Sequence, residues 1–155
     1  MNKEFNRYNL YCECAREAIK FQGLGDDIDE DVLNFTFDAL THETDLDWVD
    51  IKTDDGELIG FLVVSRSPEL FPGIEYDVDC MYILPDYRRQ GYMSRMIKKY
   101  LEDNPGTYSY SVLVGNDISF SFWDKIIHDN NCVPIGLKNP YIYKEYVFGA
   151  FKKEV

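Results

Sequence analysis

The segment 83–94 constrains the fold of this chain more than any other, because it combines a strand end, a tight basic turn and a helix start. Residues 75–83 alternate and are rich in β-branched and aromatic side chains, which predicts a strand before the turn. Apolar residues at helical spacing follow between 93 and 101, and Asn104–Pro105–Gly106 predicts the end of that helix. Residues 108–114 predict a second strand, which a right-handed crossover would place parallel to the first.

The turn itself has the chemistry of a diphosphate-binding loop. A helix start presents free backbone N–H groups and a partial positive charge. Arg88 and Arg89 add full charges that suit phosphate, Gly91 lets the backbone approach a ligand, and Ser94 adds a hydroxyl in the first helical turn. From these residues alone, an ordinary strand–helix–strand unit with a solvated basic turn is the alternative interpretation.

The turn also resembles a known signature, the acetyl-CoA motif of the GNAT N-acetyltransferases, usually written V-x-P-x-[YF]-[RQ]-x-x-G-x-[GA]. The matching residues are Ile83, Pro85, Tyr87, Arg88 and Gly91. The sequence departs from the motif at Met93, where Gly or Ala is usual. A second element of the family, N-x-x-A-x-x-[FY]-Y-x-K, is similar to Asn116, Ser119, Phe122, Trp123 and Lys125. The resemblance spans about residues 48–148, and residues 1–47 do not clearly show the family's usual first strand.

This resemblance implies an α/β (α+β) fold: a mixed, mostly antiparallel central sheet with flanking helices and one βαβ phosphate-binding crossover, in a single domain over 1–155. The pattern along the chain agrees with it. The expected helices are 6–22, 29–40 and 116–128, and the expected hairpins are 48–53 with 58–65 around Asp54–Asp55–Gly56, and 132–137 with 141–148 around Lys138–Asn139–Pro140.

The resemblance further implies that acetyl-CoA is the cosubstrate. The expected cofactor-binding residues are Met81, Ile83, Arg88, Arg89, Gln90, Gly91, Tyr92, Met93, Ser94, Asn116 and Trp123. Met81 occupies the position whose backbone N–H stabilises the oxyanion in the family, and Asn116 either contacts the pantetheine arm or an ordered water, or caps a helix. Trp123 replaces the tyrosine that many members use as general acid, and an indole N–H cannot give up its proton at useful pH.

Three carboxylates precede the turn at a spacing of two residues, namely Glu75, Asp77 and Asp79, and would share one face of a regular strand. Asp77 and Asp79 lie at the offsets where members of the family carry a catalytic Glu or His, so both are candidate general bases. Clustered carboxylates also raise one another's pKa. The alternative is a solvated strand face, or a surface that simply attracts a cationic amine.

The net charge of −12, from 28 acidic and 16 basic residues, argues against nucleic acid as the main partner and suits a cationic substrate, although acidity also serves solubility. Five basic residues between 88 and 99 form a positive segment within this acidic chain, as a polyanionic cofactor would need. No apolar run reaches the ~20 residues that span a membrane. Without a signal-peptide core at the N-terminus, the four cysteines are expected to be reduced thiols in a cytoplasm, and with two lone histidines no metal site is expected. The expected oligomeric state is a monomer or homodimer.

Three functions fit these residues. The first is an acetyl-CoA-dependent N-acetyltransferase that acts on a primary amine of a small molecule or peptide. The second is a GNAT-like acyl-CoA-binding regulatory module with weak or no activity, which Trp123 and Met93 favour. The third is an interaction protein that retains only the fold.

Overall fold

The computed structural model describes residues 3–23, 29–66, 68, 72–137 and 146–155, and side chains from residue 7 onward. The helices are α1 (Lys3–Phe21), α2 (Glu30–His42), the short 3-10 helix η1 (Pro85–Tyr87), α3 (Tyr92–Asp103) and α4 (Asp117–Asp129). The strands are β1 (Leu46–Lys52), β2 (Leu58–Arg66), β3 (Tyr76–Ile83), β4 (Gly106–Leu113), β5 (Val133–Ile135) and β6 (Tyr146–Lys153).

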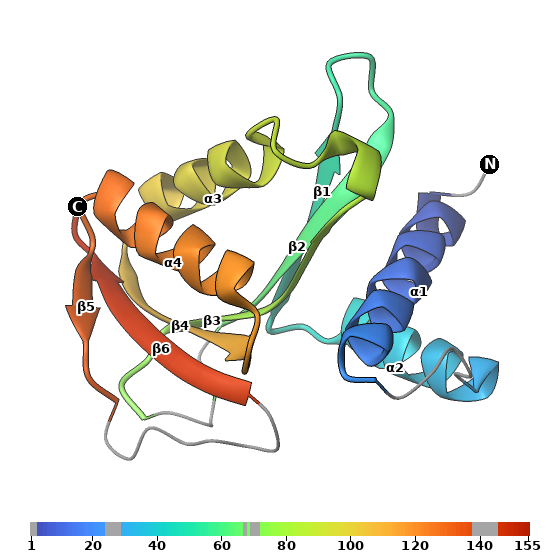
Figure 1. Ribbon diagram of the computed structural model, residues 1–155, viewed down its shortest axis with the longest axis horizontal. Coiled ribbons are helices and arrows are strands. Elements are labelled where there is room, and N and C mark those ends of the chain that lie inside the picture. Colours follow the sequence, from blue (N-terminus) through green and yellow to red (C-terminus); the bar gives the residue numbers. More distant parts are fainter. Residues whose placement is uncertain (1–2, 24–28, 67, 69–71, 138–145) are drawn as a thin grey trace.

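The described strands form a six-stranded sheet in the order β1-β2-β3-β4-β6-β5. Neighbouring strands are antiparallel except β3 and β4, which the crossover through α3 makes parallel. Helices α3 and α4 cover one face of the sheet, and α1 and α2 lie on the other side (Figure 1). This architecture confirms the predicted mixed, mostly antiparallel sheet with one βαβ crossover.

A core cluster lies on each face of the sheet. Between the sheet and helices α3 and α4, it includes Ile97, Tyr108, Trp123 and Phe151. Between the sheet and α1, it includes Leu10 of that helix and buried side chains of β2 and β3. Val78 belongs to the first cluster and Tyr82, four residues later, to the second, because the bulge described below reverses the alternation of β3. The sheet therefore has a helix-covered, apolar surface on both sides of the strand that leads into the basic turn.

The closing hairpin differs in register from the prediction. β6 runs from Tyr146 to Lys153 and pairs Val133 with Lys152, whereas the sequence predicted a strand over 141–148. The strand extends further because Ala150 and Phe151 are buried against the sheet, so the apolar pattern continues beyond Phe148. The predicted turn at 138–140 and the first residues of that strand, 141–145, lie outside the described residues.

Strands β3 and β4 separate soon after they meet. Their pairing covers only Tyr76, Asp77 and Val78 of β3, whereas β4 pairs with β6 along its whole length. The register between β2 and β3 shifts at the same place, since Val63 pairs with Cys80 and Val64 with Val78, which leaves Asp79 as the extra residue of a bulge. A bulge bends its strand. The bend directs the end of β3, and with it the basic turn, away from β4.

Across the described part of the chain, no helix is long and apolar enough to cross a membrane.

Candidate functional site

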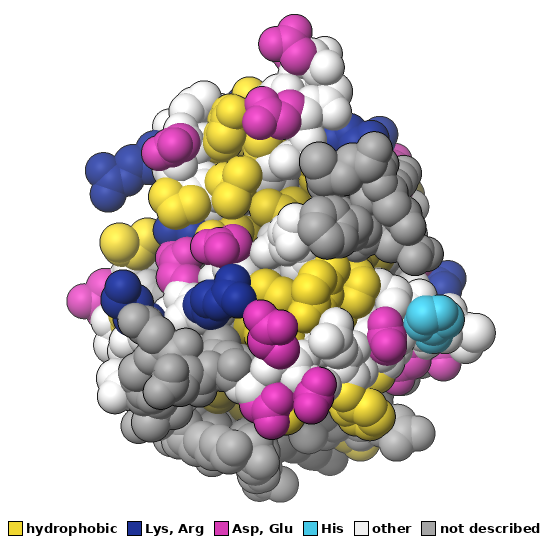
Figure 2. Space-filling model, turned by 90° about the vertical axis from the view of Figure 1, so that its right-hand side faces the viewer, with side chains coloured by type: hydrophobic (Ala, Val, Ile, Leu, Met, Phe, Trp, Pro, Cys, Tyr) yellow, Lys and Arg dark blue, Asp and Glu magenta, His cyan; other side chains and the backbone are white. Residues whose placement is uncertain are grey.

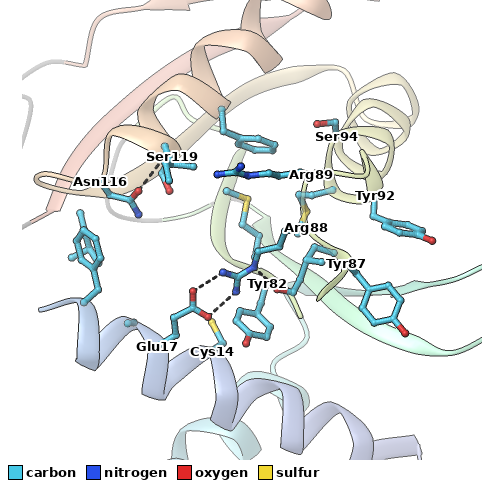
Figure 3. A pocket seen from close by; sticks show the side chains of 18 of the residues that line it. Cys14, Glu17, Tyr82, Tyr87, Arg88, Arg89, Tyr92, Ser94, Asn116 and Ser119 are labelled. Carbon is cyan, nitrogen blue, oxygen red and sulfur yellow. Dashed lines mark hydrogen bonds and ion pairs between the residues drawn. The ribbon is translucent and has the colours of Figure 1, made fainter. Parts of the chain in front are cut away.

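A cavity of about 670 Å³ lies where β3 and β4 have separated. Its walls come from α1, the ends of β3 and β4, the turn after η1, and the starts of α3 and α4 (Figure 3). The lining residues are Cys14, Glu17, Ala18, Phe21, Met81, Tyr82, Ile83, Tyr87, Arg88, Arg89, Gly91, Tyr92, Met93, Ser94, Leu113, Asn116, Ile118, Ser119 and Phe122. Residues from 14 to 122 thus meet at one site.

The turn presents backbone donors to this cavity. Gly91 caps α3 in the left-handed region with φ +83°, a conformation that favours glycine. The first backbone hydrogen bond of α3 runs from Arg95 N to Gly91 O at 3.0 Å. The amides of residues 92–94 precede it and have no acceptor within the helix. Arg95 also donates to the carbonyl of Gln90 at 2.9 Å, which holds the turn in shape. The result is a set of N–H groups at the positive end of a helix, as an anion requires.

Arg89 adds a positive charge to this turn that has no partner among the described residues. Its backbone has φ +64°, which is uncommon for a residue other than glycine. Its side chain points into the cavity, between the starts of α3 and α4 (Figure 3). Within the described residues, no hydrogen bond or ion pair satisfies its guanidinium. A cation held beside free amides without a partner fits a diphosphate.

Arg88, by contrast, is already paired. Its Nε donates to Ile83 O at 2.8 Å, and its Nη1 and Nη2 donate to the two carboxylate oxygens of Glu17 at 2.8 and 2.7 Å (Figure 3). The hydrogen bond from Arg88 lowers the pKa of Glu17, and the bond to Glu17 raises the pKa of Arg88. The guanidinium also lies 5.3 Å from the ring centre of Tyr82. Arg88 therefore lines the cavity and also joins α1 to the turn through its ion pair with Glu17.

The remaining cofactor residues divide into two groups. Met81, Ile83, Tyr92, Met93 and Ser94 line the cavity. Gln90 is not among the lining residues, because its side-chain amide donates to Asp86 O at 3.1 Å.

Asn116 is the helix cap that the sequence suggested, and it also lies at the cavity. It lines the cavity, and its Oδ1 accepts from Ser119 N at 3.2 Å as the N-cap of α4. Ser119 and Phe122 follow it at i+3 and i+6 and also line the cavity, so they define the face of α4 that meets the site.

Trp123 lies on the other side of α4. It is 2 % exposed, stacks on Tyr110 with ring centres 4.6 Å apart, and is not among the lining residues. The stacked ring of Tyr110 and the tilted ring of Phe151 fix this orientation. Trp123 is a core side chain in this structure, and the cavity-facing position next to it is occupied by Phe122.

A prediction follows for Trp123. Trp123→Tyr removes part of a buried ring, so we expect the free energy of unfolding to fall by about 1–3 kcal/mol. The rate per folded molecule should hardly change, because the side chain does not reach the cavity. Thermal denaturation and a rate assay on the same preparation check both expectations. Phe122→Leu is the matched control, because Phe122 faces the cavity. If Trp123→Tyr changed the rate as much as Phe122→Leu does, the assignment of Trp123 to the core alone would be contradicted.

The two candidate bases lie together near the bulge. Ser109 donates to Asp77 Oδ1 at 2.7 Å, and Ser65 donates to Asp79 Oδ2 at 2.5 Å. Burial, a hydrogen bond with Asp79 and the charge of Asp79 raise the pKa of Asp77 to about 8. Neither carboxylate lines the cavity. Asp77 alternates with Tyr76 and Val78, which pack toward α3 and α4, so it projects from the opposite face of the sheet, where β3 and β4 begin to separate.

Sequence reasoning missed the contribution of α1. Cys14, Glu17, Ala18 and Phe21 fall at helical spacing on one face and line the cavity. The signal was present, since Glu17 is a charged residue within the apolar stripe of that helix. Its partner Arg88 is 71 residues away, which no local pattern indicates.

Comparison with known proteins decides which family this arrangement represents. The model of the acetyltransferase (GNAT) family matches residues 7–126, which is more than half of the chain. The chain belongs to the GNAT family. The match begins within α1, so the family's region extends well before residue 48, where the motif resemblance started.

Solved structures with the GNAT fold agree in architecture. Spermidine N-acetyltransferase from Vibrio cholerae, in complex with CoA and spermine, superposes with a TM-score of 0.63 at 12 % identity, over 97 % of this chain and 90 % of that one. Tetrahymena GCN5 gives a TM-score of 0.64 at 8 % identity, over 99 % and 91 %. The aminoglycoside 6'-N-acetyltransferase AAC(6')-Ih from Acinetobacter baumannii gives 0.53 at 17 % identity, over 76 % and 82 %. No curated protein matches the sequence.

Among the described residues, no group of three or more His, Cys, Asp or Glu side chains could hold a metal ion.

Proposed function

We propose that this protein is an N-acetyltransferase that moves the acetyl group of acetyl-CoA to a primary amine. One observation carries the proposal: free amides of residues 92–94 and the unpaired Arg89 face a cavity that opens between two diverging strands. These groups fit the diphosphate of CoA in charge and hydrogen-bonding type. The cavity then offers the apolar side chains of Met81, Leu113 and Phe122 to the rest of the cofactor.

The chemistry needs a base, since an amine is protonated at neutral pH and cannot attack a thioester in that form. Asp77 suits this task because its pKa of about 8 lies near the operating pH, so its carboxylate can take a proton from the ammonium group, directly or through water. Asp79 supports Asp77 by raising that pKa. Both residues project from the face of the sheet opposite α3 and α4, so the amine would approach from the side of α1 and α2.

Two further roles complete the proposed reaction. Acetyl-CoA, when bound, supplies the reactive thioester. The backbone N–H of Met81, at the end of β3 beyond the bulge, is proposed to donate to the carbonyl oxygen as negative charge develops there. Trp123 is buried in the core, so we assign it no part in proton transfer.

The acceptor is proposed to be cationic. The chain carries a net charge of −12. Figure 2 shows acidic side chains spread around apolar surface on the side that carries α1 and α2. Such a surface raises the local concentration of a positively charged acceptor. The neighbours named for spermidine and aminoglycosides are N-acetyltransferases, and their acceptors are the first compounds to test.

The test is an acetylation screen with purified protein over polyamines, aminoglycosides, amino acids and peptides, followed by release of free CoA thiol. We expect turnover with at least one cationic amine. Calorimetry with CoA provides the second measurement. CoA binding without turnover on any amine would favour the alternative function, an acyl-CoA-binding regulatory module, for which the buried Trp123 in place of a titratable tyrosine is the specific observation. Absence of CoA binding would contradict both functions.

A further inference from the structure

Two cysteines from distant parts of the chain meet beside the cavity. Cys14 of α1 and Cys80 of β3 are 66 residues apart in sequence, and their sulfur atoms lie 3.6 Å apart in a hydrogen-bonding contact. Both side chains are partly buried against the cluster formed by Leu10, Phe61 and Tyr82. The contact therefore spans the junction between a helix that lines the cavity and the strand that leads into the turn.

We propose that Cys14 and Cys80 form a redox modification site: a hydroperoxide converts the pair to a disulfide that ties α1 to β3 and weakens CoA binding. A disulfide needs sulfur atoms about 2.05 Å apart, so the present contact must shorten by about 1.5 Å. The other two cysteines do not share this geometry. Cys12 lies two residues before Cys14, on another face of α1, and the recorded contact of the Cys132 sulfur is with the carbonyl of Asn130.

The chemistry balances with the hydroperoxide as oxidant. The sulfur of Cys80 attacks one peroxide oxygen, the O–O bond breaks, and the product is a sulfenic acid with release of an alcohol, or of water from hydrogen peroxide. The sulfur of Cys14 then attacks the Cys80 sulfur, which forms the S–S bond and releases water with the thiol proton. In sum, two thiols and one hydroperoxide give one disulfide, one alcohol or water, and one further water. Cys80 is assigned the first step because the contact with Cys80 and burial raise the pKa of the Cys14 thiol, which disfavours its thiolate in the reduced pair.

The cavity would respond because α1 forms one of its walls. Glu17 and Ala18 follow Cys14 within about one helical turn, and both line the cavity. On the other side of the contact, Met81 and Tyr82 follow Cys80 and line it as well. Drawing α1 toward β3 moves these two walls together, and closely packed elements transmit such shifts. This part of the proposal rests on the proposed cofactor site, whereas disulfide formation does not.

The first experiment treats the full-length protein with hydrogen peroxide and reads the mass of the intact chain and of its peptides. We expect a loss of about 2 Da and a cross-linked peptide pair containing Cys14 and Cys80. The melting temperature should rise by roughly 5–15 °C and return after dithiothreitol, because the bond closes a long loop. Cys14→Ser and Cys80→Ser should abolish these changes, while the matched controls Cys12→Ser and Cys132→Ser should retain them.

The second experiment measures CoA affinity by calorimetry before and after oxidation. We expect the dissociation constant of the wild type to rise at least about threefold on oxidation, and that of Cys80→Ser to stay constant. Oxygen adducts in place of the cross-link, or a cross-link that persists in Cys80→Ser, would overturn the modification site. A disulfide that leaves CoA affinity unchanged would overturn only its link to the cavity, and failure of the reduced protein to bind CoA would reject the proposed function instead.

Discussion

Gly91→Glu is expected to weaken the binding of CoA by at least about 100-fold. The change places a carboxylate at the helix start where the diphosphate is proposed to lie, and a like-charge contact in a binding site costs several kcal/mol. It also forces a side chain into the left-handed backbone of φ +83°, where a Cβ would meet the end of the Arg95 side chain at 2.6 Å. Isothermal titration calorimetry with CoA measures the effect.

Two variants separate charge from backbone strain in this experiment. Gly91→Ala carries the strain without the charge, so it should lose much less affinity than Gly91→Glu. Arg89→Ala removes the unpaired cation and leaves the backbone donors, and we expect a loss of roughly tenfold. Lys98→Ala, on the exposed surface of α3 where the side chain lies 4.0 Å from Glu102, is the matched basic control and should bind CoA as the wild type does. Equal affinity in Gly91→Glu and wild type would remove the turn from the cofactor site.

The turn could be predicted from sequence because its properties are local. The strand before it, the glycine, the two arginines and the apolar stripe of α3 all lie within about thirty residues, and each follows from spacing or residue type. The position of Gly91 as the left-handed cap of α3 needs no distant contact. The mixed character of the sheet followed from the same unit, since a crossover makes its two strands parallel and hairpins make theirs antiparallel.

The features of the site that could not be predicted from sequence depend on contacts between residues far apart in the chain. Arg88 and Arg89 are adjacent, identical and both at the cavity, and only the docking of Glu17 from α1 decides which of the two is paired. The orientation of Trp123 is set by the rings of Tyr110 and Phe151, which belong to β4 and β6. The bulge at Asp79 appears only in the register with β2. Sequence identifies which groups are present, and tertiary packing decides which of them face the site.

Asp77→Asn is expected to lower turnover by about 100-fold or more, while CoA affinity stays nearly unchanged. The amide has the shape of the carboxylate and its oxygen can still accept the hydrogen bond from Ser109, but it cannot take a proton from the amine. In the wild type, Asp77 is a base only when it is ionised, so the rate at saturating acceptor should rise with pH and level off above about pH 8. The rate–pH profile of the variant should lose this step.

Stability provides an independent check on Asp77 that requires no substrate. Burial and Asp79 raise its pKa from the usual value near 4 to about 8 in the folded protein, so folding favours the protonated form. The stabilisation that results is fully present below about pH 4 and is lost as the pH rises through 8. Melting temperatures of the wild type should therefore fall between pH 5 and 9 more steeply than those of Asp77→Asn, which carries no ionisable group there. The variant should also melt at the higher temperature at pH 8. The melting difference could be observed while Asp77→Asn, Asp79→Asn and the double variant all keep full turnover. In that case the carboxylates are not the base, and the amine reacts through its small neutral fraction.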